Sequence, residues 1–252
     1  MKRLLAVLLF LPVVLPVRAF AWTRASDERI AEKSAMLAPP DLRVVLTRYD
    51  PSYKTGIARA QSEEGSETHH YFVLSRSGKL RERIEAETTK TISMIRKRES
   101  MAQVVEHLGI LAHLVADANN PFHVSNENPR LDPSHDDFEQ YFERRMAKFP
   151  TVFYGLDDQP NVSTIVQRAV TRTEHFYPLM GSEYLSDDGE RRTSADFDDH
   201  STAFGVASVC YSHAVTDLVN LYYYIWREAG GDVRSASVMH GSNLILNATT
   251  SN

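Results

Sequence analysis

The sequence predicts an all-α protein, a multi-helix bundle, and two observations carry this prediction. Apolar residues recur three and four positions apart in several long segments, most clearly at Val104, Leu108, Leu111 and Val115. Alternation of apolar and polar residues, the pattern of half-buried strands, is scarce. We therefore expect functional side chains to project from facing helices into a cleft between core helices.

The expected helices follow one another along the chain, and most end at recognisable stop signals. A first helix over 27–36 is stopped by Pro39-Pro40, and a second begins at Asp41. Segment 50–67 is rich in Ser, Gly and Glu, and this composition predicts a loop. Residues 150–200 show no clear division. The remaining helices are expected over about 79–98, over 104–118, around 135–146 and over 204–229.

Residues 1–21 have the pattern of a secretory signal peptide. They begin with two basic residues, continue through an apolar run broken by Pro12 and Pro16, and close on Ala19-Phe20-Ala21. The run is short for a bilayer span, and its small final residues fit signal peptidase. We therefore expect cleavage before Trp22 and an exported protein, periplasmic or secreted, with no transmembrane segment after cleavage. An uncleaved anchor is the alternative.

Residues 22–252 are expected to form a single domain, because no Pro/Gly/Ser-rich linker divides them and their length suffices for a sizeable core. The formal net charge is -5, and removal of the three cations in 1–21 would make it -8. Such an acidic protein would need metal ions to hold the phosphates of a nucleic acid. Cys210 is the single cysteine, which excludes an intrachain disulfide and favours a buried apolar role. No protein partner can be inferred.

Five residues around the segment 107–139 have the spacing of metal ligands. His113 and Asp117 lie four residues apart on an expected helix and therefore point to the same side, and His123 follows just past the helix end. His135 and Glu139 repeat the spacing on the next helix. Imidazole and carboxylate suit zinc at neutral pH, because neither needs a costly deprotonation. A single such pair is usually an ordinary helix pair, but the combination predicts a zinc site.

These motifs resemble the zinc-dependent phospholipase C and single-strand-specific nuclease superfamily. The resemblance is firmest over 108–142, where it rests on His113-Leu114-Val115-Ala116-Asp117, on Asn120-Pro121-Phe122-His123 and on the pair His135 and Glu139. Trp22 at the expected cleavage point and His70-Tyr71 support it. The resemblance implies an all-α fold, up to three Zn2+ ions, and hydrolysis of a phosphodiester substrate, either a phospholipid head group or single-stranded nucleic acid.

The resemblance also implies a set of metal ligands, in three groups. Trp22 would bind one ion through its α-amine and its carbonyl, with Asp27 as a further ligand, and the usual pKa of an α-amine, about 7.7 to 8.0, leaves much of it neutral. Asp117 would bridge this ion to a second one, which is shared by His70 and His113. The third ion would be held by His123, His135 and Glu139. Asp117 and Glu139 are the carboxylates that we expect to be catalytic.

Two positions depart from the pattern of that superfamily. Its members have a His a few residues after the N-terminal Trp, where this chain has Asp27. Asp27 can still bind zinc, although an Asp before an apolar helical run is also a common N-cap. The superfamily has an Asp before the His-Tyr segment, where this chain has Ala60 and Gln61, so that ligand is unassigned. His69 is expected to be a neighbour of the ligand His70.

The function that we expect from these features is that of an exported zinc-dependent phosphodiester hydrolase of the phospholipase C type. A zinc-dependent single-strand nuclease of the same superfamily is the alternative. A relative that binds metal without catalysing a reaction is an alternative of another class.

Overall fold

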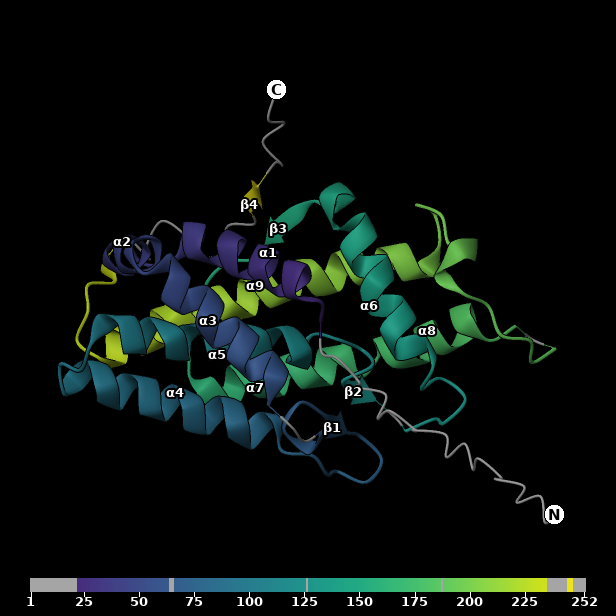
Figure 1. The fold of residues 1–252 in the computed structure, drawn as a ribbon, viewed down its shortest axis with the longest axis horizontal. Coiled ribbons are helices and arrows are strands. Elements are labelled where there is room, and N and C mark those ends of the chain that lie inside the picture. The colour runs from purple at the N-terminus through teal and green to yellow at the C-terminus, as the bar shows by residue number, and fades with distance from the viewer. Residues whose placement is uncertain (1–21, 64–65, 126, 187, 235–243, 247–252) are drawn as a thin grey trace, which may run out of the picture.

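The computed structural model describes residues 22–63, 66–125, 127–186, 188–234 and 244–246 (Figure 1). The expected signal peptide, 1–21, lies outside the described residues. The described chain is mainly helical, which confirms the all-α prediction. Among the described residues, no helix is both long and apolar enough to span a bilayer. The α-helices are α1 (Arg24–Leu37), α2 (Pro40–Arg48), α3 (Asp50–Ser62), α4 (Leu80–Arg96), α5 (Met101–Ala118), α6 (Ser134–Arg145), α7 (Val162–Thr173), α8 (Phe176–Tyr184) and α9 (Thr202–Glu228).

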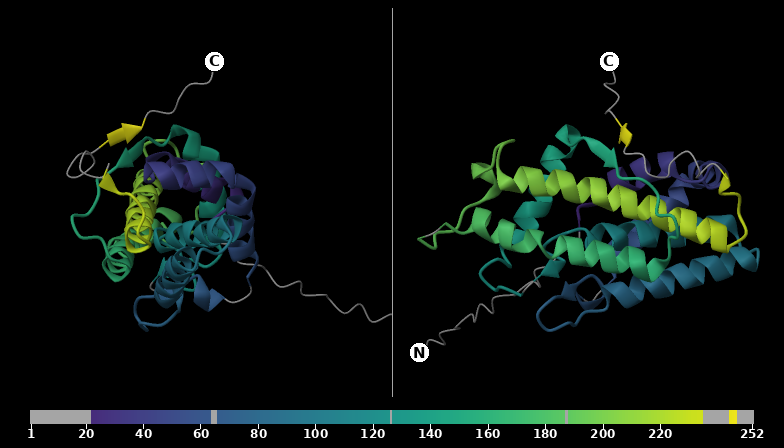
Figure 2. Two further views of the ribbon diagram at one scale, coloured as in Figure 1. Left: turned by 90° about the vertical axis from the view of Figure 1, so that its left-hand side faces the viewer. Right: turned by 180° about the vertical axis from the view of Figure 1, so that it is seen from behind.

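Helix α5 lies at the centre of the bundle. It packs against α3 and α4 most extensively, and against α1, α7 and α9 as well. Every residue from His107 to Ala118 is buried, as expected for a helix that is covered on all sides. Figure 2 shows α9 running nearly the whole length of the bundle. Helix α6 crosses the bundle steeply near the end where α8 lies (Figure 1).

Side chains cap the start of several helices. Thr23 precedes α1 and accepts a hydrogen bond from Ser26 N–H. Asn161 does the same for α7, and Ser201 for α9. These residues are among those that favour N-caps, because their side-chain oxygens satisfy N–H groups that have no partner within the helix.

The prediction of a loop over 50–67 is wrong for most of that segment, because α3 occupies Asp50–Ser62. Its buried residues are Tyr53, Gly56, Ile57 and Ala60, which have helical spacing but include two small side chains. The small residues serve close packing. A Cβ atom added at Gly56 would lie 1.9 Å from the Glu106 carbonyl oxygen on α5.

Short strands join distant parts of the chain. Strand β1 (Tyr71–Phe72) pairs in parallel with β2 (Val124–Ser125), and β3 (Thr151–Phe153) pairs antiparallel with β4 (Leu244–Leu246). Tyr71 N–H donates to the His123 carbonyl at 2.8 Å. This pairing holds His69 and His70, which precede β1, beside His123, which precedes β2. Short 3-10 helices occupy Ser66–Thr68, Met146–Lys148 and Ser194–Asp196.

Candidate metal centre

Buried histidines and carboxylates from five parts of the chain meet at the C-terminal end of α5. None of them is more than 9% exposed. Helix α1 contributes its first turn, α5 its last two turns, α6 its first two turns, and the residues just before β1 and β2 complete the cluster. The members of this cluster are Asp27, His69, His70, His113, Asp117, His123, His135 and Glu139.

One group within the cluster consists of His69, His113 and Asp117. Asp117 Oδ2 lies 2.9 Å from His69 Nδ1 and 3.3 Å from His113 Nε2. The two imidazole nitrogens are 3.2 Å apart. His113 and Asp117 are one turn apart on α5, so the helix itself directs both side chains to the same point.

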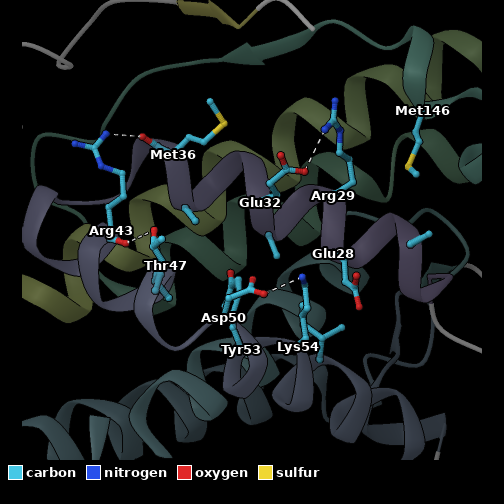
Figure 3. A pocket seen from close by; sticks show the side chains of 15 residues that line it. Glu28, Arg29, Glu32, Met36, Arg43, Thr47, Asp50, Tyr53, Lys54 and Met146 are labelled. Carbon is cyan, nitrogen blue, oxygen red and sulfur yellow. Dashed lines mark hydrogen bonds and ion pairs between the residues drawn. The ribbon is translucent and has the colours of Figure 1, made fainter. Parts of the chain in front are cut away.

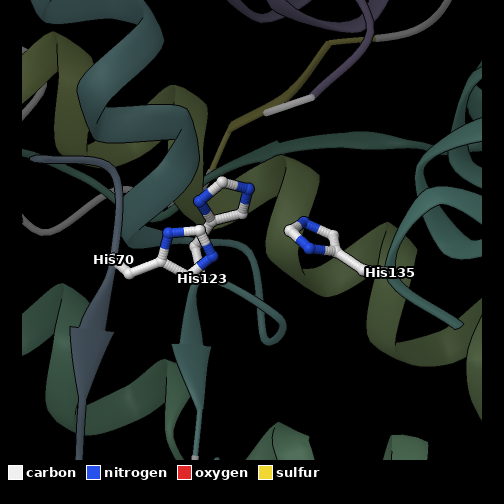
Figure 4. Close-up of side chains that lie close together, drawn as sticks. All are labelled: His70, His123 and His135. Carbon is white, nitrogen blue, oxygen red and sulfur yellow. The ribbon is translucent and has the colours of Figure 1, made fainter. Parts of the chain in front are cut away.

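The second group consists of His70, His123 and His135, with Glu139 beside it. Figure 4 shows the three imidazole rings facing a common space. The His123 ring centroid lies 4.4 Å from that of His70 and 4.7 Å from that of His135. Glu139 Oε1 is 2.9 Å from His135 Nε2 and 3.4 Å from His123 Nε2.

The structure corrects the expected partners of His69 and His70. His69, which we expected to be a neighbour of the ligand, contacts Asp117, whereas His70 lies with His123 and His135. The physical reason is that adjacent residues in a non-helical segment direct their side chains to different sides. The sequence therefore located this His pair but gave no signal for which member faces which group.

Asp27 and Trp22 approach the first group from α1. Thr23 is the N-cap of α1, so Asp27 does not have the capping role that was its alternative. Its Oδ2 lies 2.8 Å from His113 Nδ1, the nitrogen opposite the one that faces Asp117. Gln61, in the last turn of α3, donates both to Asp27 Oδ2 at 2.8 Å and to the Trp22 carbonyl at 2.7 Å. The Trp22 backbone therefore lies beside the cluster.

Hydrogen bonds behind the imidazoles fix which ring nitrogen faces the cluster. His123 Nδ1 donates to the His69 carbonyl at 2.7 Å, and His113 Nδ1 is held by Asp27. The Nε2 atoms of both rings are then left to face the neighbouring ligands. This arrangement is common for histidines that bind metals, because the outer hydrogen bond sets the tautomer and the ring orientation.

The close packing of these groups shifts their pKa values. Burial raises the pKa of the Asp27 carboxyl to about 7, although His113 opposes the shift. Burial would lower the pKa of His113, but the carboxylates of Asp117 and Asp27 outweigh it and raise that pKa to about 9. Burial also disfavours ionised Asp117, yet His113 and His123 hold its pKa well below the usual range. Opposite charges therefore hold this site together.

The donor atoms of the cluster could hold a metal ion. Asp27 Oδ1 and Asp117 Oδ1 are buried and have no hydrogen-bond partner among the described residues, and His135 Nε2 lies near Glu139 without hydrogen-bond geometry. In the described part of the chain, all recorded ion pairs of Asp27, Asp117 and Glu139 are with histidines, never with Lys or Arg. Buried charge without such partners fits a donor set for a cation, and imidazole with carboxylate is a zinc donor set.

The other histidines have different surroundings. His107 is buried and contacts the Glu87 carboxylate. His175 and His200 are exposed, whereas His213 stacks on Tyr154. His240 lies outside the described residues. None of the described four belongs to either histidine group.

A separate hollow of about 540 Å³ opens between α1, α2 and α3 (Figure 3). Four of its charged side chains form two pairs, Arg29 with Glu32 at 3.1 Å and Lys54 with Asp50 at 2.8 Å. No member of the histidine cluster lines it. It therefore lacks the chemistry of the metal centre.

Comparison with known proteins relates the chain to others by its fold. No protein-family model matches it, and no curated protein matches its sequence. Among solved structures, Clostridium perfringens alpha-toxin from an avian strain is similar, with a TM-score of 0.56 and 14% sequence identity. The match covers 82% of this chain and 65% of the alpha-toxin chain. The chain thus has a distant structural similarity to alpha-toxin, limited to the helical fold.

Proposed function

We propose that this protein is a zinc-dependent phosphodiester hydrolase of the phospholipase C type. The observation that carries the proposal is the buried cluster of three carboxylates whose ion-pair partners, among the described residues, are all histidines. A hydrolase with a bound Zn2+ cluster needs such a set of ligands. The fold that the chain shares with alpha-toxin and the superfamily motifs of residues 108–142 support the same proposal.

The proposal gives each group of residues a role. His69, His113 and Asp117 would hold one ion, and His70, His123, His135 and Glu139 another. Asp117 would contribute to both, because its Oδ2 faces His69 and His113 while its Oδ1 lies 3.9 Å from His123 Nε2. The Trp22 carbonyl and Asp27 would complete a third site, together with the α-amine that cleavage before Trp22 would release.

The charge of the cluster explains why metal would be required. Asp27, Asp117 and Glu139 are buried together, and in the described chain the neighbouring histidines are the groups that balance their charge when no metal is bound. Bound zinc would neutralise these carboxylates, attract the phosphate oxygens and make a bound water acidic enough to supply hydroxide near neutral pH. The histidines orient the site, since His113 and His123 are themselves fixed through Nδ1.

The phospholipase type is favoured over the nuclease type by one sequence feature. The run from Asn120 to His123, with Asn126 three residues after the histidine, resembles the phospholipase version of this segment more than the nuclease version.

The test is to count zinc per chain in the purified protein and to assay phosphatidylcholine and single-stranded DNA side by side. We expect bound zinc and hydrolysis of the phospholipid. His113→Ala should lose zinc, thermal stability and activity, because it leaves inward-facing carboxylates unneutralised. His200→Ala, a change at an exposed histidine, is the matched control and should behave as wild type. Hydrolysis of DNA alone would assign the nuclease type, and zinc without hydrolysis of either substrate would indicate an inactive metal-binding relative.

A further inference from the structure

Two adjacent asparagines follow α5 directly, and their side chains reach different partners. Asn119 and Asn120 are both completely buried. The amide of Asn120 donates to Glu139 Oε1 at 3.2 Å, inside the histidine cluster. The amide of Asn119 donates instead to Asp217 Oδ2 on α9, also at 3.2 Å. Buried amides are costly unless they are hydrogen-bonded, so both contacts stabilise a single conformation of this turn.

Asn120 connects three members of the cluster. Its N–H donates to the Asp117 carbonyl at 2.9 Å, and its own carbonyl accepts from His123 N–H at 3.0 Å. Its side-chain Oδ1 accepts from Phe122 N–H at 3.0 Å. This last bond fixes which end of the amide is oxygen, so that the NH2 group is the end that faces Glu139.

Asn120 also differs in kind from the other partners of Glu139. Among the described residues, those other recorded partners are His123 and His135, which are members of the metal centre themselves. Asn120 has no lone pair directed at the cluster and carries no charge. It can therefore orient the Glu139 carboxylate without competing for a cation.

The turn that carries Asn120 is anchored from its other side by the buried Asp217 and two half-buried arginines. Asn119 Oδ1 accepts from Arg172 Nη2 at 2.9 Å, and the same nitrogen lies 2.5 Å from Asp217 Oδ2. Arg168 Nη2 contacts the second oxygen of Asp217 at 3.1 Å. Helices α7 and α9 thus hold Asn119 in place, and its neighbour Asn120 is held with it.

We propose that Asn120 is a positioning residue, which keeps the Glu139 carboxylate in line with His123 and His135 while Asn119 anchors the turn to Arg172 and Asp217. The role in metal binding rests on the proposed function. The hydrogen bond from Asn120 to Glu139 belongs to the fold with or without zinc, so the two ideas can fail separately.

The first measurement is zinc affinity by competition with a chelating dye. Asn120→Asp keeps the size of the side chain and the acceptor for Phe122 N–H, but it turns an acceptor toward Glu139. We expect one zinc-binding step to weaken about 10- to 100-fold, the usual effect of changing a residue that orients a ligand. Asn128→Asp is the matched control, because Asn128 Oδ1 accepts from Arg130 N–H in a similar turn away from the cluster. Equal zinc affinities for wild type and Asn120→Asp would overturn the proposal.

The second measurement is thermal unfolding of the full chain after treatment with a chelator. Asn120→Asp should lower the Tm by about 5 °C or more, since two buried carboxyl groups then face each other. Adding Glu139→Gln should recover most of this loss in Tm, because the amide introduced at position 139 can donate to the carboxylate introduced at position 120. Additive losses in the double variant would show that Asn120 does not act through Glu139. If the wild-type chain binds no zinc, the proposed function fails. The Tm values of Asn120→Asp with and without Glu139→Gln then still decide whether Asn120 orients Glu139.

Discussion

Asp27 brings a buried carboxylate from the first turn of α1 to His113. The sequence left two roles open for it, helix cap or zinc ligand, and the structure gives the cap to Thr23. Asp27 is instead buried against His113 Nδ1, with its other oxygen lacking a hydrogen-bond partner. A buried carboxylate with one free oxygen is well placed to bind a cation.

We predict that Asp27→Ala loses one zinc ion per chain, whereas Asp27→His retains it, because imidazole is also a good zinc ligand. Thr23→Ala is the control. It should cost about 0.5 to 2 kcal/mol of unfolding free energy through loss of the cap and leave the zinc content unchanged. Metal analysis of the three variants decides the matter. An unchanged zinc count in Asp27→Ala with weaker affinity would show that Asp27 acts only by orienting His113.

A second prediction at this scale concerns acid stability. Burial, assisted by Arg172, lowers the pKa of His213 from its usual 6.5 to about 4. Between these values the unfolded chain binds a proton that the folded chain does not, so the unfolding free energy falls as the pH drops from about 6.5 to about 4. Arg168 and Asp217 also face this ring, with opposing effects on its pKa.

His213→Gln should therefore lose less stability than wild type between pH 7 and pH 5. Urea unfolding at both pH values, with a chelator present to keep the metal centre constant, measures the difference. His175→Gln alters an exposed histidine and should retain the pH dependence of wild type. The explanation is wrong if His213→Gln and wild type lose the same amount.

At the scale of helices, the sequence pattern located the long apolar helices but missed α3, and it did not separate α7 and α8 within the segment 150–200. The expected helix over 204–229 corresponds to α9, and the one over 79–98 to α4. Helix α3 was missed because its buried stripe includes Gly56 and Ala60, which add little to an apolar pattern. The positions of His69 and His70 could not be resolved either, because they depend on the pairing of β1 with β2, a contact between residues far apart in the sequence.

The crossing of α3 and α5 gives a prediction for Gly109, with Gly205 on α9 as the control. A Cβ atom added at Gly109 would lie 2.1 Å from the Tyr53 carbonyl oxygen, as close as the clash at Gly56. Gly109→Ala should therefore destabilise the protein by about 1 to 3 kcal/mol, because backbone cannot move aside cheaply. Gly205→Ala on α9 meets no atom within 4 Å and should be neutral or stabilising by up to about 1 kcal/mol. Chemical denaturation compares them, and equal effects would refute the packing argument.

At the scale of the whole molecule, Trp22 joins the start of the described chain to the metal centre. Its indole N–H donates to the Ala116 carbonyl on α5 at 2.7 Å, and its ring packs against Phe142 on α6 with centroids 4.0 Å apart. The same residue offers its carbonyl beside Asp27. Contacts with α3, α5 and α6 thus fix the position of this backbone.

We predict that a variant retaining one extra residue before Trp22 keeps its helical content but binds less zinc and loses activity. An amide nitrogen replaces the α-amine in that variant, and it is a poor ligand. Circular dichroism, metal analysis and the phospholipid assay measure the three properties. Mass spectrometry of the exported protein should find Trp22 first, and a fully active protein beginning elsewhere would contradict this prediction.

The single buried cysteine, Cys210, offers a way to measure local unfolding of the chain. The thiol lies on α9, is 1% exposed, and has its pKa raised by burial to about 12, so the reactive thiolate is scarce in the folded state. Because the sequence contains one cysteine, a thiol-selective reagent such as a maleimide labels the protein when α9 separates from the core. The rate of Cys210 labelling then reports how readily α9 opens. A rise in that rate when a chelator removes bound metal would show that the metal helps to keep the bundle closed.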